Sequence, residues 1–263
     1  MESRHSRPRP AAPLSLGALR HEGGAALRAA LAGPPEEAVR WLDAAARYGL
    51  VEAQLWLGQC LLDGRGTPPA PVRALGWFRV AARAGYPPAM NMLGRCLERG
   101  WGCRPDPAAA VAWYREAAAE GEEWAQYNLA NALLRGRGVP ADRAGALHWF
   151  RRAAASGHAK SMNLVGRFHE EGWECRRDPA AAARCYRHTA EEGDERGAYN
   201  WATCLARAGR GGEAAIWFLR AARAATPDLL AVMAETLAGQ PAFAAAFEVV
   251  SRRRAATRRG SPP

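Results

Sequence analysis

The sequence is poor in lysine, and this shapes how its charge is interpreted. Lys160 is the single lysine among 36 basic residues, which face 26 acidic ones and give the 263-residue chain a net charge of +10. A basic balance can indicate binding to nucleic acid or to an anionic membrane surface. Arginine, alanine, glycine and proline are abundant together, however, as in proteins from GC-rich genomes. The charge is therefore interpreted first as a solvated, codon-biased surface.

The sequence also lacks long apolar runs. No stretch approaches the roughly 20 apolar residues that span a bilayer. The basic N-terminus, residues 1–13, is not followed by the apolar region of a secretory signal. Both absences predict a cytoplasmic protein with no membrane span. The six cysteines are then expected to stay reduced, because intracellular thiols rarely form disulfides.

Catalytic and metal-binding patterns are missing as well. The six histidines form no H-E-x-x-H pattern, and the His-Glu-Glu run at 169–171 is better explained by polar residues at a helix end. Cys103 and Cys175 lie far apart in sequence, whereas zinc-binding thiolates usually come as C-x-x-C. The Gly-Arg-Gly segments at 64–66 and 136–138 lack the strand and the lysine of a phosphate-binding loop. We therefore predict no enzyme, no metal, no cofactor and no small-molecule substrate.

What the sequence does contain is a repeat. Trp41, Trp77, Trp113 and Trp149 follow one another at intervals of 36 residues. Two sets of glycines and one of prolines keep the same period: Gly49, Gly85, Gly121, Gly157 and Gly193; Gly64, Gly100, Gly136 and Gly172; Pro35, Pro71, Pro107 and Pro179. Internal periods of this length are typical of solenoids, which stack one structural unit on the next.

Each unit is predicted to form two helices. In the unit at 123–157, apolar residues spaced by three and four mark one face of a first helix, which ends at Gly136. Asp142 is placed to cap the second helix. The face that packs inward is expected to hold Ala125, Leu129, Ala132 and Leu133 of the first helix and Ala146, Trp149, Phe150, Ala153 and Ala154 of the second. We expect the tryptophan to fill the volume between consecutive units, and the small residues near it to allow close helix packing.

Two segments, residues 89–121 and 125–157, follow the order A-x-x-x-L-G or A-x-x-x-L-A, a loop glycine, an aspartate before the second helix, and W-Y or W-F. This order resembles the Sel-1-like repeat family, a relative of the tetratricopeptide repeats, over about residues 36–226. The resemblance implies adaptor or scaffold roles and no reaction. The fold expected is all-α, a right-handed α/α solenoid of 36-residue helix-turn-helix repeats. Ala70, in place of a capping aspartate, and Glu174, in place of a loop glycine, depart from the pattern.

The domain organisation predicted from these observations has five parts. They are a disordered Arg/Pro-rich N-terminus at 1–14, an N-terminal helical cap with a partial repeat at 15–51, the repeats at 52–226, C-terminal capping helices at 227–254, and a disordered basic tail at 255–263. Asp228 is expected to cap the first closing helix, and Pro241 to begin the second. Such end helices cover the last apolar face of a solenoid.

A binding groove is predicted from the first helix of each unit, which lines the concave face in tetratricopeptide-like solenoids. The residues predicted to form this protein-binding groove are Asn91, Arg95, Tyr127, Asn131, Lys160, Asn163, Arg167 and Tyr199. Amides can bond to the backbone of an extended peptide, and guanidinium groups can hold its carboxylates. These side chains favour an acidic protein or peptide partner. The alternative is that they are only solvated polar positions.

The function predicted is that of a protein-interaction scaffold without catalysis. The alternative is a nucleic-acid-associated basic solenoid, suggested by the charge of +10 and by the arginine-rich segment at 252–259. A nucleic-acid partner is the less favoured interpretation, because the positive charge reflects the abundance of arginine throughout the chain. The pattern does not identify the partner or its pathway.

Overall fold

The computed structural model describes residues 32–259, and within them it contains 13 α-helices, one short 3-10 helix and no strand. The all-α prediction is therefore confirmed. The chain divides into two compact units, residues 1–122 and 123–263. The predicted N-terminal segment 1–14, most of the predicted helix before Pro35 and residues 260–263 lie outside the described residues.

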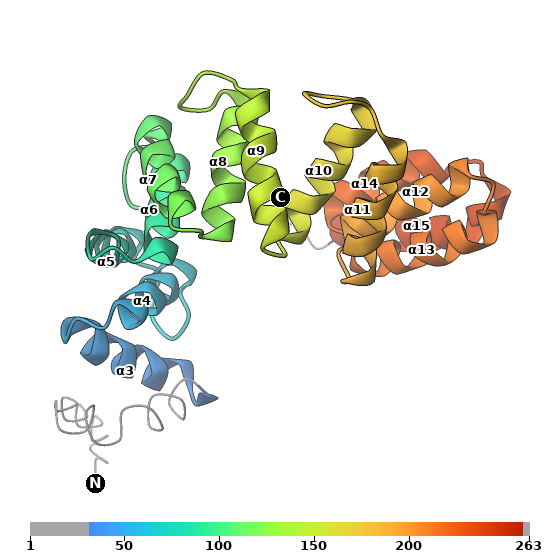
Figure 1. Ribbon diagram of the computed structural model, residues 1–263. Coiled ribbons are helices and arrows are strands. Elements are labelled where there is room, and N and C mark those ends of the chain that lie inside the picture. The colour runs from blue at the N-terminus through green and yellow to red at the C-terminus, as the bar shows by residue number, and fades with distance from the viewer. Residues whose placement is uncertain (1–31, 260–263) are drawn as a thin grey trace, which may run out of the picture. The chain divides into compact units, whose positions relative to one another are not determined.

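Unit 1 consists of five helices in its described part, and unit 2 of eight helices and the 3-10 turn (Figure 1). Unit 1 contains α3 (Pro35–Arg47), α4 (Val51–Asp63), α5 (Pro71–Arg83), α6 (Pro87–Arg99) and α7 (Pro107–Ala119). Unit 2 contains α8 (Glu123–Arg135), α9 (Arg143–Ala155), α10 (Ala159–Glu171), α11 (Pro179–Glu191), α12 (Glu195–Arg207), α13 (Gly211–Ala224), α14 (Pro227–Leu237), η1 (Pro241–Phe243) and α15 (Ala244–Arg259). Within each unit, the two helices of a repeat pack against each other and against the next repeat.

The helix starts follow the capping chemistry expected from the sequence. The carboxylates of Asp106, Asp142 and Asp178 each accept a hydrogen bond from the backbone N–H three residues on, at 2.8–2.9 Å. The prediction for α14 is wrong, because Thr226, and not Asp228, caps this helix by accepting from the Leu229 N–H. Pro227 occupies the first helical position, so Asp228 already lies inside the first turn.

A buried aromatic side chain follows four of the repeated tryptophan positions, and another follows Cys185, which stands in the tryptophan position of its repeat. Phe78 and Tyr114 in unit 1, and Phe150, Tyr186 and Phe218 in unit 2, are at most 2% exposed. The repeated tryptophans themselves are only half-buried. Adjacent helical residues lie about 100° apart, so only one of the two aromatics can point into the core. The expectation that tryptophan fills this volume is therefore wrong: the next residue fills it. Its burial contributes roughly 1.5–3 kcal/mol per side chain to the stability of the fold.

Close packing against these rings explains the small residues of the first helices. A Cβ added to Gly58 would lie 2.5 Å from the Phe78 ring, and one added to Gly94 would lie 2.6 Å from the Tyr114 ring. In unit 2, a Cβ on Gly166 would lie 2.7 Å from the Tyr186 ring. Glycine therefore allows the paired helices to approach with an aromatic ring between them, as predicted.

The buried aromatic alternates between two chemistries along the chain. Tyr114 donates its hydroxyl to Glu98, and Tyr186 donates to Glu170, at 3.0 and 2.9 Å. Phe78 and Phe150 take the same place in the other repeats, where leucine stands at the position of the glutamate: the residues are Leu62 and Leu134. The polar pair is thus present in every second repeat. Each buried phenol has the partner it needs, because an unpaired hydroxyl in a core is costly.

The third residue of the long loop has positive φ in the four repeats from α4 to α11, and glycine occupies it in three of them. Gly66 and Gly102 have φ of 69° and 77°, and a Cβ there would lie 2.2 and 2.4 Å from the carbonyl oxygens of Pro35 and Pro71. Glu174, with φ of 51°, is the single non-glycine residue with positive φ within 32–259. The left-handed conformation costs an L-residue about 1–2 kcal/mol, so Glu174 is a locally strained position.

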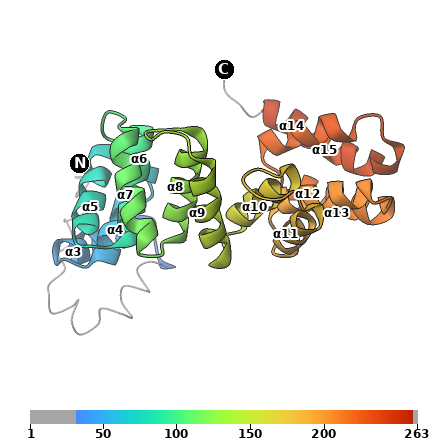
Figure 2. The same cartoon turned by 45° about the horizontal axis from the view of Figure 1, so that its top comes forward.

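Two helices, α14 and α15, lie at the C-terminal end of unit 2, and Figure 2 shows them side by side. α14, η1 and α15 bury Leu230, Met233, Phe243 and Val250 in one cluster with Phe218 of α13. α15 continues to Arg259, so the boundary predicted at 254 falls inside a helix, and residues 255–259 are helical. Within the described part of the chain, no helix is both long and apolar enough to cross a bilayer.

Candidate functional site

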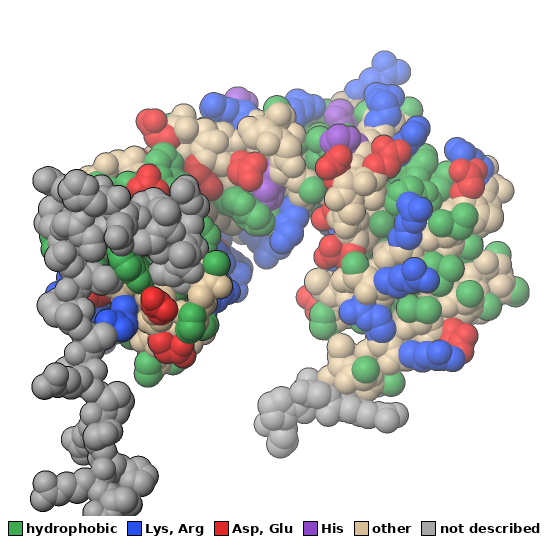
Figure 3. All heavy atoms as spheres, turned by 90° about the horizontal axis from the view of Figure 1, so that it is seen from below, with side chains coloured by type: hydrophobic (Ala, Val, Ile, Leu, Met, Phe, Trp, Pro, Cys, Tyr) green, Lys and Arg blue, Asp and Glu red, His purple; other side chains and the backbone are tan. Residues whose placement is uncertain are grey.

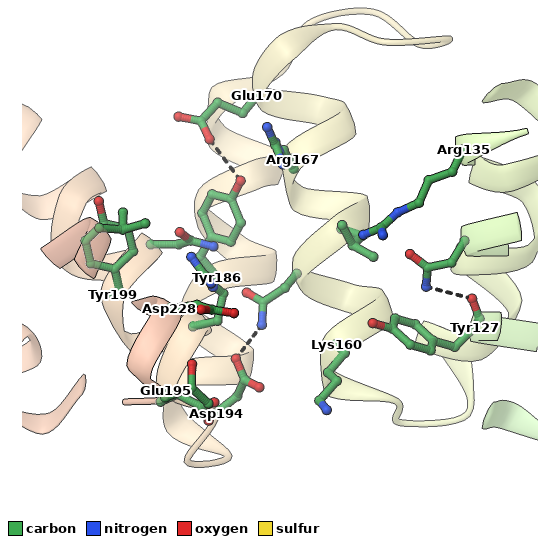
Figure 4. Close-up of a pocket in the computed structure, with 17 residues that line it drawn as sticks. Tyr127, Arg135, Lys160, Arg167, Glu170, Tyr186, Asp194, Glu195, Tyr199 and Asp228 are labelled. Atoms are coloured by element: carbon green, nitrogen blue, oxygen red, sulfur yellow. Dashed lines mark hydrogen bonds between the residues drawn. The ribbon is translucent and has the colours of Figure 1, made fainter. Parts of the chain in front are cut away.

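Unit 2 contains a hollow of about 810 Å³ that is formed by its own helices (Figure 4). Most of its lining comes from α8, α10, α12 and α14, with Tyr186 reaching in from α11. Its uncharged lining includes aromatic, amide and aliphatic side chains: Tyr127, Asn131, Asn163, Leu164, Tyr199, Asn200 and Val232. A cavity of this size is in the range of about 300–1,000 Å³ found for binding sites.

Three cations, which we call the basic wall, come from α8 and α10. Arg135 is the last residue of α8, Lys160 lies in the first turn of α10, and Arg167 lies two turns further along α10. Each makes no ion pair within residues 32–259. Lys160 also adds to the positive end of the α10 dipole, since it lies beside the free N–H groups of that helix. The basic wall therefore presents charge that nothing within the described chain neutralises.

Tryptophans restrain two of these cations. The Lys160 ammonium lies 5.4 Å from the centre of the Trp124 ring, and the Arg167 guanidinium lies 5.2 Å from that of Trp173. Arg143 stacks on the same Trp173 at 5.3 Å. Such cation–π contacts contribute about 0.5–1 kcal/mol at exposed sites. They hold long, flexible side chains near the hollow without neutralising their charge.

Three carboxylates, which we call the acidic wall, come from the starts of α12 and α14 (Figure 4). Asp194 caps α12 by accepting from the Gly197 N–H at 2.6 Å, and it also accepts from Asn163. Glu195 and Asp228 lie in first turns and accept no hydrogen bond within the described residues. Arg196, on α12, lines the hollow beside them. Two carboxylates of this wall thus have no structural partner.

A fourth carboxylate of the lining, Glu170, is already neutralised. It accepts from the Tyr186 hydroxyl at 2.9 Å and pairs with the Arg207 guanidinium at 2.5 Å. The carboxylate raises the pKa of the Arg207 guanidinium through this hydrogen bond, while burial, followed by the contact with Glu170, raises the pKa of the Tyr186 phenol. Glu170 therefore closes one side of the hollow and leaves Arg167 unpaired.

The structure brings six of the eight predicted groove residues to this hollow: Tyr127, Asn131, Lys160, Asn163, Arg167 and Tyr199. That they bind a partner stays a prediction. The other two, Asn91 and Arg95, lie on α6 in unit 1, where Asn91 is buried and Arg95 stacks on Trp101. The hollow of unit 2 is thus a smaller site than the ladder predicted along all repeats.

Asn163, which lines the hollow, also makes hydrogen bonds that link neighbouring helices. It is buried, accepts from the Thr189 hydroxyl at 3.1 Å, and donates to the Asp194 carboxylate at 2.6 Å. These bonds link α10 to the end of α11 and to the cap of α12. Its amide therefore stabilises the packing of three helices. Removing the amide would leave its buried hydrogen-bonding partners unsatisfied.

Several residues of the hollow were not predicted from the sequence, because they lie outside the repeat positions assigned to the groove. Arg135 was recognisable as a helix-end arginine, but its slot was not among those assigned to the groove. Asp228 and Val232 belong to α14, where the 36-residue period has ended. Glu195 directly follows Asp194, and an aspartate at this position is the sequence signal of a cap that leaves the next carboxylate without that role.

Behind the basic wall lies a buried histidine. His158 is 5% exposed, and its ring lies 4.5 Å from that of Trp124 and 4.8 Å from that of Tyr127. Its Nδ1 accepts from the Ser161 N–H and so caps α10, which leaves the proton on Nε2. Burial, assisted by the charge of Lys160, lowers the pKa of His158 to about 4, against an opposing effect of Asp194. His158 is therefore neutral near pH 7.

This burial predicts a pH-dependent stability. The pKa of His158 is lower in the folded chain than the 6.5 of the unfolded one, so the unfolded state binds more protons between about pH 4 and 6.5. Its contribution to the free energy of unfolding is complete above pH 6.5 and is lost as the pH falls toward 4. We expect a loss of about 2–3 kcal/mol from this group.

The measurement is urea denaturation at a series of pH values for the native chain and for His158→Asn. Asparagine can also cap α10 but does not titrate. The native chain should lose about 2–3 kcal/mol more than the variant between pH 7 and pH 4. Parallel curves for the two proteins would show that His158 does not titrate as described.

Within residues 32–259, no group of three histidine, cysteine or acidic residues could hold a metal ion. All six cysteines are free, and His169 contacts Cys175 at 3.8 Å while its neighbour Glu170 is bonded to Tyr186. The site therefore consists of hydrogen-bonding and charged groups, with stacked rings behind them. Such a lining can bind and orient a polar segment.

Comparison with solved structures agrees with this fold. A Sel1 repeat protein from Oxalobacter formigenes is 27% identical over 87% of this chain and 95% of its own, with a TM-score of 0.74. A protective antigen of uropathogenic Escherichia coli, displaying an SLR fold, is 25% identical over 84% of this chain and 57% of its own, with a TM-score of 0.56. An immunity protein from Pseudomonas aeruginosa, 14% identical with a TM-score of 0.55, shares the fold alone. No curated protein matches the sequence.

The family assignment rests on the repeats themselves. The sequence model of the Sel1 repeat matches residues 27–49, 51–86, 87–122, 125–158, 159–194 and 212–225. These segments cover more than half of the chain, and four of them, 51–86, 87–122, 125–158 and 159–194, each correspond to one helix pair. The chain belongs to the Sel1 repeat family.

Proposed function

We propose that this chain is a protein-interaction scaffold that binds an extended, acidic segment of a partner protein in the hollow of unit 2. The observation that carries the proposal is the basic wall: Arg135, Lys160 and Arg167 line one hollow and have no anionic partner within residues 32–259. Carboxylates of a bound segment would provide it. Charge-assisted hydrogen bonds of this kind are about twice as strong as neutral ones.

The remaining lining suits a peptide backbone. The amide of Asn200 and the hydroxyl of Tyr127 have no hydrogen-bonding partner within residues 32–259, and both face the hollow. Such groups can bond to the N–H and C=O groups of an extended chain. Solenoid repeats commonly use their extended concave surfaces for binding in this way. No group of the hollow is placed to activate a nucleophile, which agrees with binding as its role.

Nucleic acid is less well supported as the partner. On the face shown in Figure 3, Lys and Arg side chains are interspersed with Asp and Glu over the described residues. The hollow itself contains Glu170, Asp194, Glu195 and Asp228. A nucleic acid carries a negative charge at every phosphate and no positive group, so it would place like charge beside these carboxylates, and this repulsion would offset the free energy gained from counterion release.

Photocrosslinking of selected peptides tests the proposal. Random peptides displayed on phage are selected on the full chain, and the recovered peptides are expected to be enriched in aspartate and glutamate. A photocrosslinking amino acid at Asn200, in the hollow, should then capture them. The same amino acid at Arg184, which is exposed on α11 outside the hollow, is the control. Equal capture at both positions would contradict binding in the hollow.

A further inference from the structure

The charges of the hollow suggest what kind of segment it takes. We propose that the bound segment carries a basic side chain as well as acidic ones, and that Glu195 and Asp228 receive the basic side chain while Lys160 and Arg167 receive the acidic ones. This inference rests on the proposed function, because it names the ligand of the same hollow. It identifies the partner by its charge pattern: an acidic stretch followed or preceded by a basic residue.

Glu195 and Asp228 are not needed as helix caps. The cap of α12 is Asp194, and the cap of α14 is Thr226, so neither helix start needs a second oxygen acceptor. Neither carboxylate forms an ion pair or accepts a hydrogen bond within the described residues. Their neighbour Asp194, by contrast, accepts two bonds. The two carboxylates are therefore free to receive a cation.

A purely acidic segment would fit only one side of the hollow. Its carboxylates would pair with the basic wall, but the same segment would displace water from Glu195 and Asp228 and place like charge beside them. A buried charge without a partner is costly, and like charges at a contact oppose binding. A basic side chain of the ligand removes both penalties at once.

Two features of the acidic wall limit the strength of this second contact. Arg196 lies beside Glu195 on α12, and both carboxylates lie in first turns, where the helix dipole already stabilises negative charge. At the basic wall, the positive end of the α10 dipole adds to the positive potential of Lys160 and so strengthens the attraction for an acidic side chain. We therefore expect the acidic contacts to supply most of the affinity, and the basic contact to fix the direction in which the segment lies.

The opposite placement of the two walls is visible in Figure 4. Arg135 and Lys160 lie on one side of the hollow, and Glu195, Asp194 and Asp228 lie on the other. A segment with charges of both signs can satisfy both sides in one direction only. Charge complementarity of this kind sets specificity and register more than total affinity.

The test uses synthetic peptides and the full chain. The Glu–Lys probe has a block of glutamates followed by a block of lysines, and the Glu–Gln probe has the lysines replaced by glutamines. Calorimetry at low ionic strength compares their affinities for the native chain and for Glu195→Gln/Asp228→Asn. The Glu–Lys probe should bind the native chain at least about tenfold more tightly than the Glu–Gln probe, since one charge-assisted contact is gained. This advantage should disappear in the variant.

A matched control removes two carboxylates elsewhere in unit 2. Glu192→Gln/Glu235→Gln has the same net charge as the test variant, but neither residue lines the hollow. It should keep the tenfold preference, and thermal melting of both variants checks that they fold. If the Glu–Gln probe binds the native chain as tightly as the Glu–Lys probe, the inference is overturned and the proposed function stands. If neither probe binds, both are overturned.

Discussion

Reversing both stacked cations of the basic wall, with Lys160→Glu and Arg167→Glu, should weaken the binding of an acidic peptide by at least about 100-fold. Each lost charge-assisted contact is worth roughly 1.5–3 kcal/mol, and the introduced carboxylates add repulsion. Two such losses together exceed the roughly 2.7 kcal/mol that corresponds to 100-fold. Calorimetry with the peptides recovered by display selection measures the change directly.

Unit 2 offers a closely matched control for this variant. Arg152 and Arg220 also stack on tryptophans, at 5.0 and 4.5 Å, but they lie on the second helices α9 and α13 and outside the hollow. Arg152→Glu/Arg220→Glu makes the same change in net charge and loses the same number of stacked cations. It should lower the affinity only a few-fold, because it weakens only the long-range attraction between the chain and the acidic peptide, which salt screens. An equal loss in both double variants would mean that net charge, and not the hollow, governs binding.

Replacing Gly102 with alanine is expected to lower the free energy of unfolding by about 2–5 kcal/mol. The residue has φ of 77°, which costs an L-residue about 1–2 kcal/mol. The added Cβ would also lie 2.4 Å from the Pro71 carbonyl oxygen and 2.8 Å from the Val72 nitrogen. These are backbone atoms at the start of α5, so the loop must move, at a further cost of about 1–3 kcal/mol. Urea denaturation followed by tryptophan fluorescence gives the difference.

Gly85 separates the two contributions. It has φ of 83°, but a Cβ there would meet no atom within 4 Å. Gly85→Ala should therefore show the conformational strain alone, about 1–2 kcal/mol. If Gly85→Ala and Gly102→Ala destabilise the chain equally, the close approach of the loop to Pro71 does not contribute to the loss of stability in Gly102→Ala.

The fold was predictable from the sequence because its determinants are local and repeated. Asp106 and Asp178, each followed by proline, specify the start of a helix wherever they occur. Gly58 and Gly94 mark the close approach of two helices in the same register as the aromatics that they contact. The choice between adjacent aromatics was not predictable in this way. Trp149 and Phe150 are both apolar, and only packing shows that the second is buried.

The candidate site was predictable only in part, because it depends on which charges remain unpaired. Lys160 and Arg167 could be assigned to the groove from their slots. That Asn163 is bound to Thr189 and Asp194 depends on how α10, α11 and α12 meet. Asp228 and Val232 reach the hollow from α14, beyond the last regular repeat, where no register predicts a position. The acidic wall therefore emerged from the structure and changed the expected ligand from acidic to mixed in charge.

The alternation of Tyr114 and Tyr186 with Phe78 and Phe150 has a consequence for how such an array can change in length. Each tyrosine needs its own glutamate, Glu98 or Glu170, in the preceding helix. A repeat joined at the wrong boundary would place tyrosine over leucine, or phenylalanine over glutamate, and would bury an unsatisfied polar group. Duplication or deletion in steps of two repeats preserves every pair. Both members of each pair lie in one repeat, so a cut between repeats preserves the pairs for any number of units, whereas a cut between the two helices of a repeat preserves them only in steps of two.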